Sequence, residues 1–263
     1  MKSVTKALAF VVVMAVSIIA CKKDAKDAAV NEISDETIAR ISQLGFSTAG
    51  VQKIEEGYLV EGDIVLTHAT LNEQPTSPTL RIAEVEQYRT FNLVGALPRV
   101  IRVSSSGDVT ASVSTAIDAA ISRFNAENLS LTFQRVASGG NINITVVNGG
   151  NYIASAGFPS GGNPYPEVKF NKKYAGYSAG FLATVIAHEM GHCIGFRHTD
   201  YMNRSYSCGT GGNEGQSTTG VGAVLIPGTP SGPDAASWML ACLSSTTNRP
   251  FNSNDKTALN YLY

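Results

Sequence analysis

Charged side chains are scarce in this chain. Only 16% of its 263 residues are charged, and the formal net charge at pH 7 is −1. Proteins that bind nucleic acid concentrate lysine and arginine on one face, whereas no strongly basic run occurs here. We therefore expect no nucleic-acid partner. Hydrophobic residues make up 43% of the chain, which permits a buried core and disfavours extended disorder.

Long apolar runs are also missing, apart from one at the N-terminus. Lys2 and Lys6 precede an apolar stretch over residues 7–20 that is too short to span a bilayer well. This order is typical of a secretory signal. The stretch ends in Ile-Ile-Ala before Cys21, which resembles a bacterial lipobox. The resemblance implies cleavage before Cys21 and lipidation of its thiol.

Two assignments follow for this N-terminal region. Residues 1–20 are predicted to be a lipoprotein signal peptide. Residues 21–34 are polar and rich in Lys and Asp, and are predicted to be a flexible, lipid-anchored tether. Lys22, rather than Asp, follows the cysteine, which is similar to outer-membrane lipoproteins. We expect an exported monomer anchored in the bacterial outer membrane, facing the periplasm or the outside. The alternative is a plain signal peptide with a chance cysteine.

Cysteine is infrequent as well. If Cys21 is lipidated, three cysteines remain in the exported protein: Cys193, Cys208 and Cys242. An oxidising compartment permits one disulfide and leaves one free thiol. We favour a Cys208–Cys242 bridge, because both residues fall in loop-like sequence while Cys193 falls within a predicted helix.

Residues 35–95 are predicted to form a separate small segment ahead of the main domain. Apolar residues recur at helical spacing over residues 35–48. Residues 58–67 have a strand-like composition that is interrupted at Gly-Asp. Residues 71–80 carry two prolines and are predicted to be a loop.

Residues 96–263 have the pattern of one larger α+β domain. Short apolar or alternating stretches predict strands, and longer stretches with apolar residues three and four apart predict helices. One helix is apolar on all sides and is therefore expected to lie buried against the sheet. The predicted strands cover residues 99–104, 129–136, 142–147 and 167–171, the predicted helices cover 111–127, 178–194 and 254–263, and residues 203–235 form a long irregular loop.

That apolar helix carries histidines at metal-ligand spacing. His188 and His192 are four residues apart, so both imidazoles project from one face of the helix, one turn apart. Glu189 is rotated by about 100° from His188, so its carboxylate can reach a water on the metal without ligating the metal. Gly195 is expected to end the helix, because glycine accepts the left-handed conformation of a sharp turn. The chain then turns back and offers His198 as a third ligand.

The three histidines form an open ligand set. Three protein ligands leave one position of a tetrahedral ion for water, as in catalytic rather than structural zinc sites. An apolar helix would not tolerate buried histidines and a glutamate without partners, which a metal and its water supply. Ordinary core or surface histidines are the alternative, but three of the four histidines in the chain fall within eleven residues. The pattern predicts one catalytic Zn²⁺, and we expect the fourth histidine, His68, on the surface.

The motif resembles that of the metzincin metallopeptidases. The run from His188 to His198, HEMGHCIGFRH, matches their HExxHxxGxxH pattern and is most similar to the HEIGH metallopeptidase family, with Met190 in place of Ile. The resemblance covers about residues 97–263. It implies a two-lobed catalytic domain, with a mixed twisted sheet and an active-site helix followed by an irregular C-terminal lobe and a terminal helix. It also implies a Met-turn beneath the metal, for which Met239 is the candidate; the alternative is an ordinary core methionine.

The sequence departs from the better-known metzincins at two positions. Ala241 stands two residues after the candidate Met-turn methionine, where astacin-like and serralysin-like members carry Tyr. Thr199 follows the third histidine in place of Glu, Ser, Pro or Asp. Stabilisation of the reacting carbonyl is then left to the metal, to a backbone N–H, or to another side chain such as Tyr201 or Tyr177.

A short motif in the N-terminal segment resembles a metzincin propeptide. The letters VEGD at residues 60–63 are similar to the FxGD motif of astacin propeptides, in which the Asp takes the place of water on zinc. The resemblance implies that Asp63 is a latent-state ligand. A carboxylate is a competent zinc ligand, and its binding would exclude the nucleophilic water. The alternative is a plain β-turn, for which Gly-Asp is common.

These patterns predict a zinc metalloendopeptidase that is made as a latent proenzyme and acts on protein or peptide substrates, with Glu189 as general base. We expect an extended substrate to pair with an edge strand near residues 167–171. Two alternatives stay open: a surface lipoprotein that uses the zinc-containing fold only for binding, and an amidase acting on cell-wall peptides. The intact Glu189 disfavours the first, because a purely structural metal site has no use for that carboxylate.

Overall fold

The computed structural model of the chain describes residues 33–72, 87–213, 220–230 and 232–263. The predicted signal peptide, Cys21 and most of the predicted tether lie outside these residues, as does most of the predicted loop at 71–80. Among the helices that are described, none combines the length and the apolar character needed to cross a membrane.

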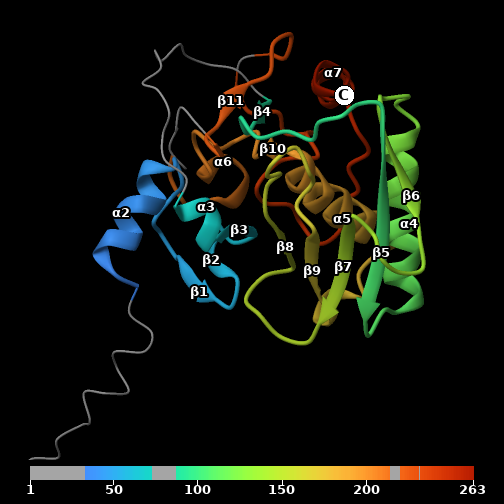
Figure 1. Cartoon of the computed structure of the whole chain (residues 1–263), viewed down its shortest axis with the longest axis horizontal. Coiled ribbons are helices and arrows are strands. Elements are labelled where there is room, and N and C mark those ends of the chain that lie inside the picture. The colour runs from blue at the N-terminus through green and yellow to red at the C-terminus, as the bar shows by residue number, and fades with distance from the viewer. Residues whose placement is uncertain (1–32, 73–86, 214–219, 231) are drawn as a thin grey trace, which may run out of the picture. The chain divides into compact units, whose positions relative to one another are not determined.

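The strand-forming stretches pair into one eight-stranded mixed sheet (Figure 1). In β7, residues 142, 144 and 146 are buried and alternate with partly exposed residues, as expected of a strand with one face on a core. The strand order is β1-β2-β3-β8-β9-β7-β5-β6, with β5, β6, β7 and β9 parallel and β8 antiparallel to β9. The strands are β1 (Gln52–Ile54), β2 (Gly57–Val60), β3 (Ile64–Thr67), β5 (Arg99–Gly107), β6 (Leu131–Arg135), β7 (Ile142–Val147), β8 (Ala154–Ala156) and β9 (Glu167–Asn171).

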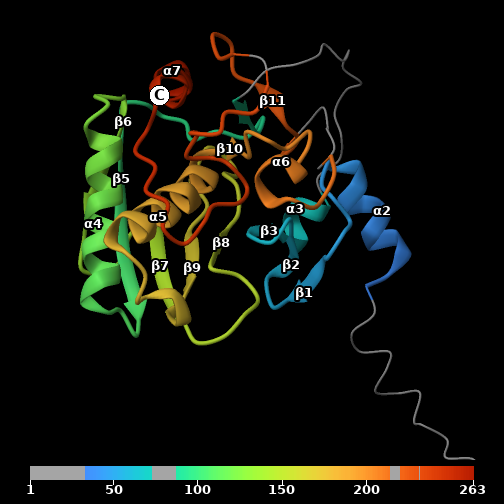
Figure 2. The same ribbon diagram turned by 180° about the vertical axis from the view of Figure 1, so that it is seen from behind.

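Two long helices, α4 (Ala111–Asn125) and α5 (Ala179–Ile194), cover one face of this sheet, as Figure 2 shows from behind. α4 turns an apolar stripe inward and begins at Thr110, whose hydroxyl accepts a hydrogen bond from a backbone N–H of the first turn. In α5, every residue from position 181 to 194 is buried, as the largely apolar sequence of this helix predicts. Ser178 caps its N-terminus and Gly195 its C-terminus.

The chain after α5 is mostly irregular. It contains β10 (Phe196–Arg197), α6 (Ser205–Cys208), β11 (Val224–Leu225) and the closing helix α7 (Ser253–Leu262). The start of α7 is a capping box. The Asn252 side chain accepts a hydrogen bond from the backbone N–H of Asp255, and the Asp255 side chain accepts one from the backbone N–H of Asn252. The α+β fold with an active-site helix followed by an irregular C-terminal part and a terminal helix is confirmed.

The first described residues form a small unit with its own apolar cluster. This N-terminal segment, residues 33–72, contains α2 (Asp35–Gln43), the strands β1 to β3 and α3 (His68–Leu71). Its cluster also takes in two side chains from later in the chain, Phe158 and Val221. His68 is exposed, as expected.

The residues just after the undescribed stretch 73–86 pack with the main domain. The two-residue strand β4 (Tyr88–Arg89) lies between β10 and β11 in a second, three-stranded sheet. Gln87 donates from Nε2 to Asp255 Oδ1 at 2.7 Å, and Val94 lies in the main core. The predicted domain boundary between residues 95 and 96 therefore does not coincide with a division in packing, and where the chain is divided functionally stays a prediction.

The structure contradicts the prediction that a substrate pairs with an edge strand near residues 167–171. β9 at residues 167–171 is not an edge strand, because β8 pairs with it on one side and β7 on the other. Among the main-domain strands of this sheet, β6 is one edge strand and β8, beside β9, is the other. The β8 edge is taken by the N-terminal segment, since Ile64 of β3 pairs in parallel with Ala156 of β8.

Candidate metal centre

The three histidines of the motif meet at one point. His188 and His192 extend from the same face of α5, and their Nε2 atoms are 3.1 Å apart. His198 reaches the same point from the chain after β10. The three side chains are almost completely buried, and their ligand atoms, together with a carboxylate oxygen of Asp63, all lie within 4.8 Å of one another.

Backbone carbonyls orient the two helical histidines. His188 Nδ1 lies 2.9 Å from the carbonyl oxygen of Trp238, and His192 Nδ1 lies 2.8 Å from that of Phe196. A carbonyl only accepts, so Nδ1 is the protonated nitrogen in each ring. Both Nε2 atoms are then left with a lone pair that faces the cluster, which is the tautomer a metal ligand requires.

Gly195 lets the chain reverse between the second and third ligands. Its φ of 111° lies in the left-handed region, and its N–H donates to the carbonyl of His192 at 2.9 Å. A Cβ at this position would come within 2.8 Å of a Leu93 methyl carbon and 3.0 Å of the Asn92 carbonyl oxygen. Thus both the backbone conformation and the close packing require glycine here.

The Met-turn lies directly against the metal-binding helix. A Cβ on Gly191, which stands between the two helical ligands, would meet the Trp238 ring at 2.5 Å and Met239 Sδ at 2.8 Å. Thr199 N donates to the Met239 carbonyl at 2.9 Å, so the chain after His198 is also held to this turn. Sequence analysis did not single out Gly191, whose missing side chain is what lets Trp238 approach and orient His188.

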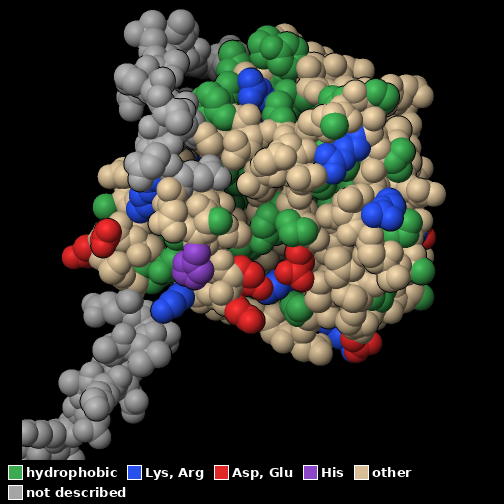
Figure 3. Space-filling model, in the orientation of Figure 1, with side chains coloured by type: hydrophobic (Ala, Val, Ile, Leu, Met, Phe, Trp, Pro, Cys, Tyr) green, Lys and Arg blue, Asp and Glu red, His purple; other side chains and the backbone are tan. Residues whose placement is uncertain are grey.

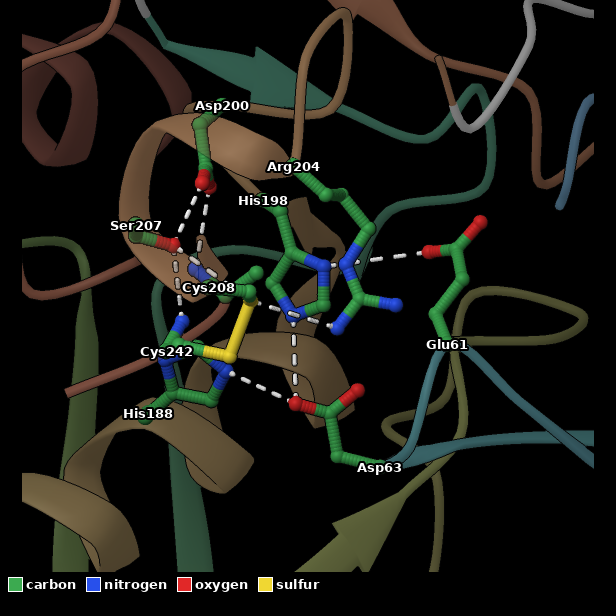
Figure 4. Close-up of a disulfide and its surroundings, with 10 residues drawn as sticks. Glu61, Asp63, His188, His198, Asp200, Arg204, Ser207, Cys208 and Cys242 are labelled. Atoms are coloured by element: carbon green, nitrogen blue, oxygen red, sulfur yellow. Dashed lines mark hydrogen bonds and ion pairs between the residues drawn. A yellow bond between two sulfur atoms is a disulfide. The ribbon is translucent and has the colours of Figure 1, made fainter. Parts of the chain in front are cut away.

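Asp63 occupies the fourth corner of the cluster (Figure 4). Its Oδ2 lies 3.2 Å from His198 Nε2 and 3.6 Å from His188 Nε2. Burial by itself raises the pKa of this carboxyl. The positive charge of His198, together with the close approach of His188 and His198, outweighs burial and holds the pKa of Asp63 well below its usual range.

The donor set fits a tetrahedral zinc ion. With Zn–N distances of about 2.0–2.1 Å, ligand atoms at the corners of a tetrahedron lie about 3.3 Å apart. The spacings of 3.1, 3.2 and 3.6 Å between donors match that value. Three neutral imidazoles and one carboxylate are also the ligand types that zinc prefers. These four residues therefore form a site for one metal ion.

Glu189 lies beside this cluster on α5. Its carboxylate is buried, and Oε2 has no hydrogen-bond partner among the described residues. Burial and the neighbouring negative charge of Asp63 raise the pKa of Glu189 well above its usual range, against an opposing effect of His198.

A cavity of about 240 Å³ opens onto the cluster. It is bounded by the metal-site side chains, by the chain that leads into β8, and by the stretch after the Met-turn. Tyr201 and Tyr177 do not line it: Tyr201 stacks on Tyr88, and Tyr177 packs on Phe181 at the start of α5. Its lining residues with hydrogen-bond donors, apart from His188, are Asn151, Tyr152 and Arg204, which the sequence alone did not suggest.

A disulfide closes one side of this cavity (Figure 4). Cys208 and Cys242 are joined, and Cys193 is a free thiol buried in α5. Asp200 supports the same region: its Oδ2 accepts from Ser207 Oγ at 2.5 Å, and its Oδ1 accepts from the backbone N–H of residue 241 at 3.0 Å. The short helix α6 is thereby fixed to the stretch that follows the Met-turn.

A family model described as the dual-action HEIGH metallo-peptidase matches residues 58–263. The chain belongs to this family. It is therefore a metallopeptidase, with a histidine and carboxylate cluster that suits a metal ion. The match begins within β2 and so includes the hairpin that carries Asp63.

Two solved structures of myroilysin are similar to this HEIGH metallopeptidase. The first has a TM-score of 0.46 and 18% identity, and covers 65% of this chain and 96% of that chain. The second has a TM-score of 0.40 and 17% identity, and covers 63% of this chain and 83% of that chain. Among curated protein sequences, none matches this chain.

Proposed function

We propose that this HEIGH metallopeptidase is a zinc-dependent endopeptidase that is made as a latent proenzyme. The observation that carries the proposal is the juxtaposition of three histidines, the buried Glu189 carboxylate and Asp63 at one cavity. The histidines supply three permanent ligands, and Asp63 takes the fourth position in the latent chain. Removal of Asp63 would leave that position open to water.

Glu189 is the proposed general base. Bound zinc supplies Lewis-acid chemistry, which lowers the pKa of a water and polarises the scissile carbonyl. Glu189 accepts the proton of the attacking water and then passes it to the leaving nitrogen.

The carbonyl oxygen that becomes negative needs a hydrogen-bond donor in the cavity. Ala241 offers no side-chain donor. Tyr152 and Arg204 line the cavity with a phenol and a guanidinium, and a donor aimed at a developing oxyanion stabilises the transition state. We assign this role to these two side chains in place of Tyr201 and Tyr177.

The N-terminal segment is the proposed inhibitory propeptide. It covers the metal site with Asp63 and occupies the edge of β8 with β3, so both the metal and the strand on which an extended substrate would pair are taken. Further contacts hold the segment in place: Lys169 on β9 forms an ion pair with Glu56, and Phe46 stacks on Phe158 with ring centroids 6.1 Å apart.

We further propose that the enzyme is exported and anchored in the outer membrane through a lipid on Cys21. The lipobox-like sequence before that residue supports the anchor. A protein or peptide is the expected substrate and a monomer the expected state. A nucleic-acid partner is not expected, since on the face drawn in Figure 3 the Lys and Arg side chains are scattered and form no continuous patch.

One experiment tests the proposed activity. A recognition site for a sequence-specific protease, inserted between Asn72 and Gln87, lets the chain fold whole and be cut afterwards. The zinc-loaded protein is then incubated with casein or a peptide library before and after the cut. We expect cleavage after the cut, and loss of cleavage on addition of a chelator or with Glu189→Ala.

The alternatives predict different results. If the cut, zinc-loaded protein binds peptides but cleaves neither casein nor any library member, the endopeptidase proposal is wrong and a binding protein is favoured. If it cleaves only cell-wall peptides, the amidase is favoured.

A further inference from the structure

The hairpin that carries Asp63 carries a second buried carboxylate, Glu61. Its Oε1 accepts a hydrogen bond from Ser47 N at 3.1 Å and lies 3.8 Å from Arg197 Nη2, while its Oε2 lies 3.7 Å from His198 Nδ1. Figure 4 shows that Glu61 and Asp63 leave the same turn. The segment therefore places two carboxylates into the main domain, one at the metal ligands and one beside Arg197.

The backbone at Glu61 is strained. Its φ is 58°, and only three non-glycine residues with positive φ occur in the described part of the chain. This region is unfavourable for L-residues, and Glu, unlike Asn or Asp, is not among the residues that tolerate it. Such strain is typical of positions where a side chain serves a function, and here the side chain of Glu61 reaches a buried cation.

Arg197 is that cation, and it is fully buried. Its Nη1 donates to the Val221 carbonyl at 2.8 Å, a contact within the main domain. Further contacts lie in the N-terminal segment: the carbonyl of Gly45 at 3.4 Å, the ring of Phe46 at 4.1 Å, and Glu61. Departure of the segment would remove a carboxylate, a carbonyl and an aromatic ring from one guanidinium.

Arg197 also has backbone contacts within the main domain. It belongs to β10, which pairs with β4 through Arg197 and Tyr88, and it directly precedes the ligand His198. Phe158, which packs on His192 with ring centroids 5.5 Å apart, lies 5.8 Å from the guanidinium. The mature enzyme would thus keep a fixed cation, flanked by an aromatic ring, next to the metal site.

We propose that Arg197 is a carboxylate-binding subsite of the substrate cleft. In the mature enzyme it binds a glutamate side chain of the peptide in the place that Glu61 takes in the latent chain. The planar guanidinium fork matches a carboxylate and is always charged, and apolar surroundings strengthen the pair. Since Glu61 is two residues from Asp63, the preferred glutamate lies within about two residues of the cleaved bond.

This inference rests on the proposed function, because the N-terminal segment must leave before a substrate reaches Arg197. The first test measures kcat/KM of the cut, zinc-loaded enzyme on peptides that carry Glu or Gln at single positions around the cleaved bond. We expect at least a tenfold preference for Glu at one position. In Arg197→Gln the Glu-to-Gln ratio should fall to within about twofold of one. In the control Arg102→Gln, which changes an exposed arginine on β5, the ratio should be unchanged.

A second measurement covers the case in which Arg197→Gln fails to fold. Glu61→Gln leaves the main domain unaltered and changes only the segment. After the cut between Asn72 and Gln87, the Glu61→Gln segment should dissociate at least tenfold more readily than the wild-type segment. Equal retention would show that this carboxylate adds no affinity at Arg197 and would overturn the proposal, as would a wild-type enzyme with no Glu preference.

Peptide binding separates failure of the subsite from failure of the proposed activity. The same Glu and Gln peptides are titrated into the cut, zinc-loaded Glu189→Ala protein. Tighter binding of the Glu peptides by tenfold, with no cleavage by the Glu189-containing enzyme, would uphold the subsite and reject the endopeptidase. Cleavage without any Glu preference would uphold the endopeptidase and reject the subsite.

Discussion

The metal cluster draws its ligands from two regions of very different construction. α5 is buried on all sides, and backbone carbonyls fix the rings of His188 and His192. Asp63 instead sits on a turn with two residues in the left-handed region, and its side chain is 15% exposed. A rigid helix suits permanent ligands, and a turn at the tip of a hairpin suits the proposed role of Asp63 as a ligand that leaves.

The apolar clusters around α5 and around the Asp63 hairpin also differ in size. α5 lies in the main core, which spans the sheet, α4 and the Met-turn. The hairpin packs in a small cluster whose members outside the segment are Phe158 and Val221. Small clusters open locally at lower free energy than the main core, so the segment can separate while the metal site keeps its shape.

The variant with the largest expected effect removes one of the three histidine ligands. In His192→Ala, two histidines remain, and we expect the chain to lose its zinc and all measurable peptidase activity. Metal analysis of the purified protein checks the first expectation and casein cleavage the second. Asp63→Ala is the matched variant, since it also removes one ligand but should retain one zinc per chain. Equal zinc loss in both variants would contradict the distinction between permanent histidine ligands and an exchangeable Asp63.

The close packing of α5 against Trp238 and Met239 depends on Gly191. In Gly191→Ala the new methyl group would overlap the Trp238 ring and Met239 Sδ, and overpacking of this kind destabilises a core by about 1–3 kcal/mol. Denaturant unfolding of the metal-free chain measures the change. Gly176→Ala is the control, because a Cβ there meets nothing within 4 Å. A Gly191→Ala chain as stable as the control would show that the Met-turn is not pressed against the helix.

Asp63→Ala in the uncut, full-length chain tests whether Asp63 is an exchangeable ligand. Loss of the carboxylate opens the fourth position while the segment stays attached, so we expect peptidase activity to rise by at least tenfold over the uncut wild type. Initial rates on a short fluorogenic peptide measure this. Asp118→Ala, at an exposed position on α4, should leave the uncut chain as inactive as before. An uncut Asp63→Ala chain without activity would mean that occlusion by the segment, and not ligation, maintains latency.

The part of the site that sequence predicts well is the part built from local spacing. The four-residue step from His188 to His192 and the stop at Gly195 are consequences of helix geometry, so they can be read without any tertiary information. The Asp63 assignment came from resemblance to a propeptide motif. The structure brings Asp63 to the histidines, but its role as a latent ligand stays a prediction.

What sequence does not predict are pairings between distant segments. β8 is three residues long, Ala-Ser-Ala, and has no alternation that marks a strand, so its place at the edge was missed. Gly191 and Arg197 were missed for the same reason. The tight space at Gly191 is created by Trp238, and the burial of Arg197 by the N-terminal segment, and neither neighbour is local in sequence.

The smallest expected effect is the change in folding stability of the metal-free chain at acidic pH. Burial lowers the pKa of His192, as do the positive charges of His188 and His198. Between pH 6.5 and that lowered pKa, the unfolded chain binds a proton at this residue that the folded, metal-free chain does not. This contribution to stability is therefore lost as the pH falls below about 6.5, by up to about 1.4 kcal/mol per pH unit for one proton, while the raised pKa values of Glu189 and Asp255 act in the opposite direction. Asp63, whose pKa is also lowered, adds a loss below about pH 4.

Urea unfolding of the metal-free chain at pH 7.5 and 5.5 measures this slope. His192→Gln should flatten the slope, because the titrating group on the permanent side is gone. Asp63→Asn should change the slope less than His192→Gln does, because the lowered pKa of Asp63 places its own titration at lower pH and it acts on this interval only through its neighbours. If Asp63→Asn alone flattens the slope between pH 7.5 and 5.5, the charge balance of the cluster is set by the hairpin rather than by the helix, and the comparison between the two regions would have to be reversed.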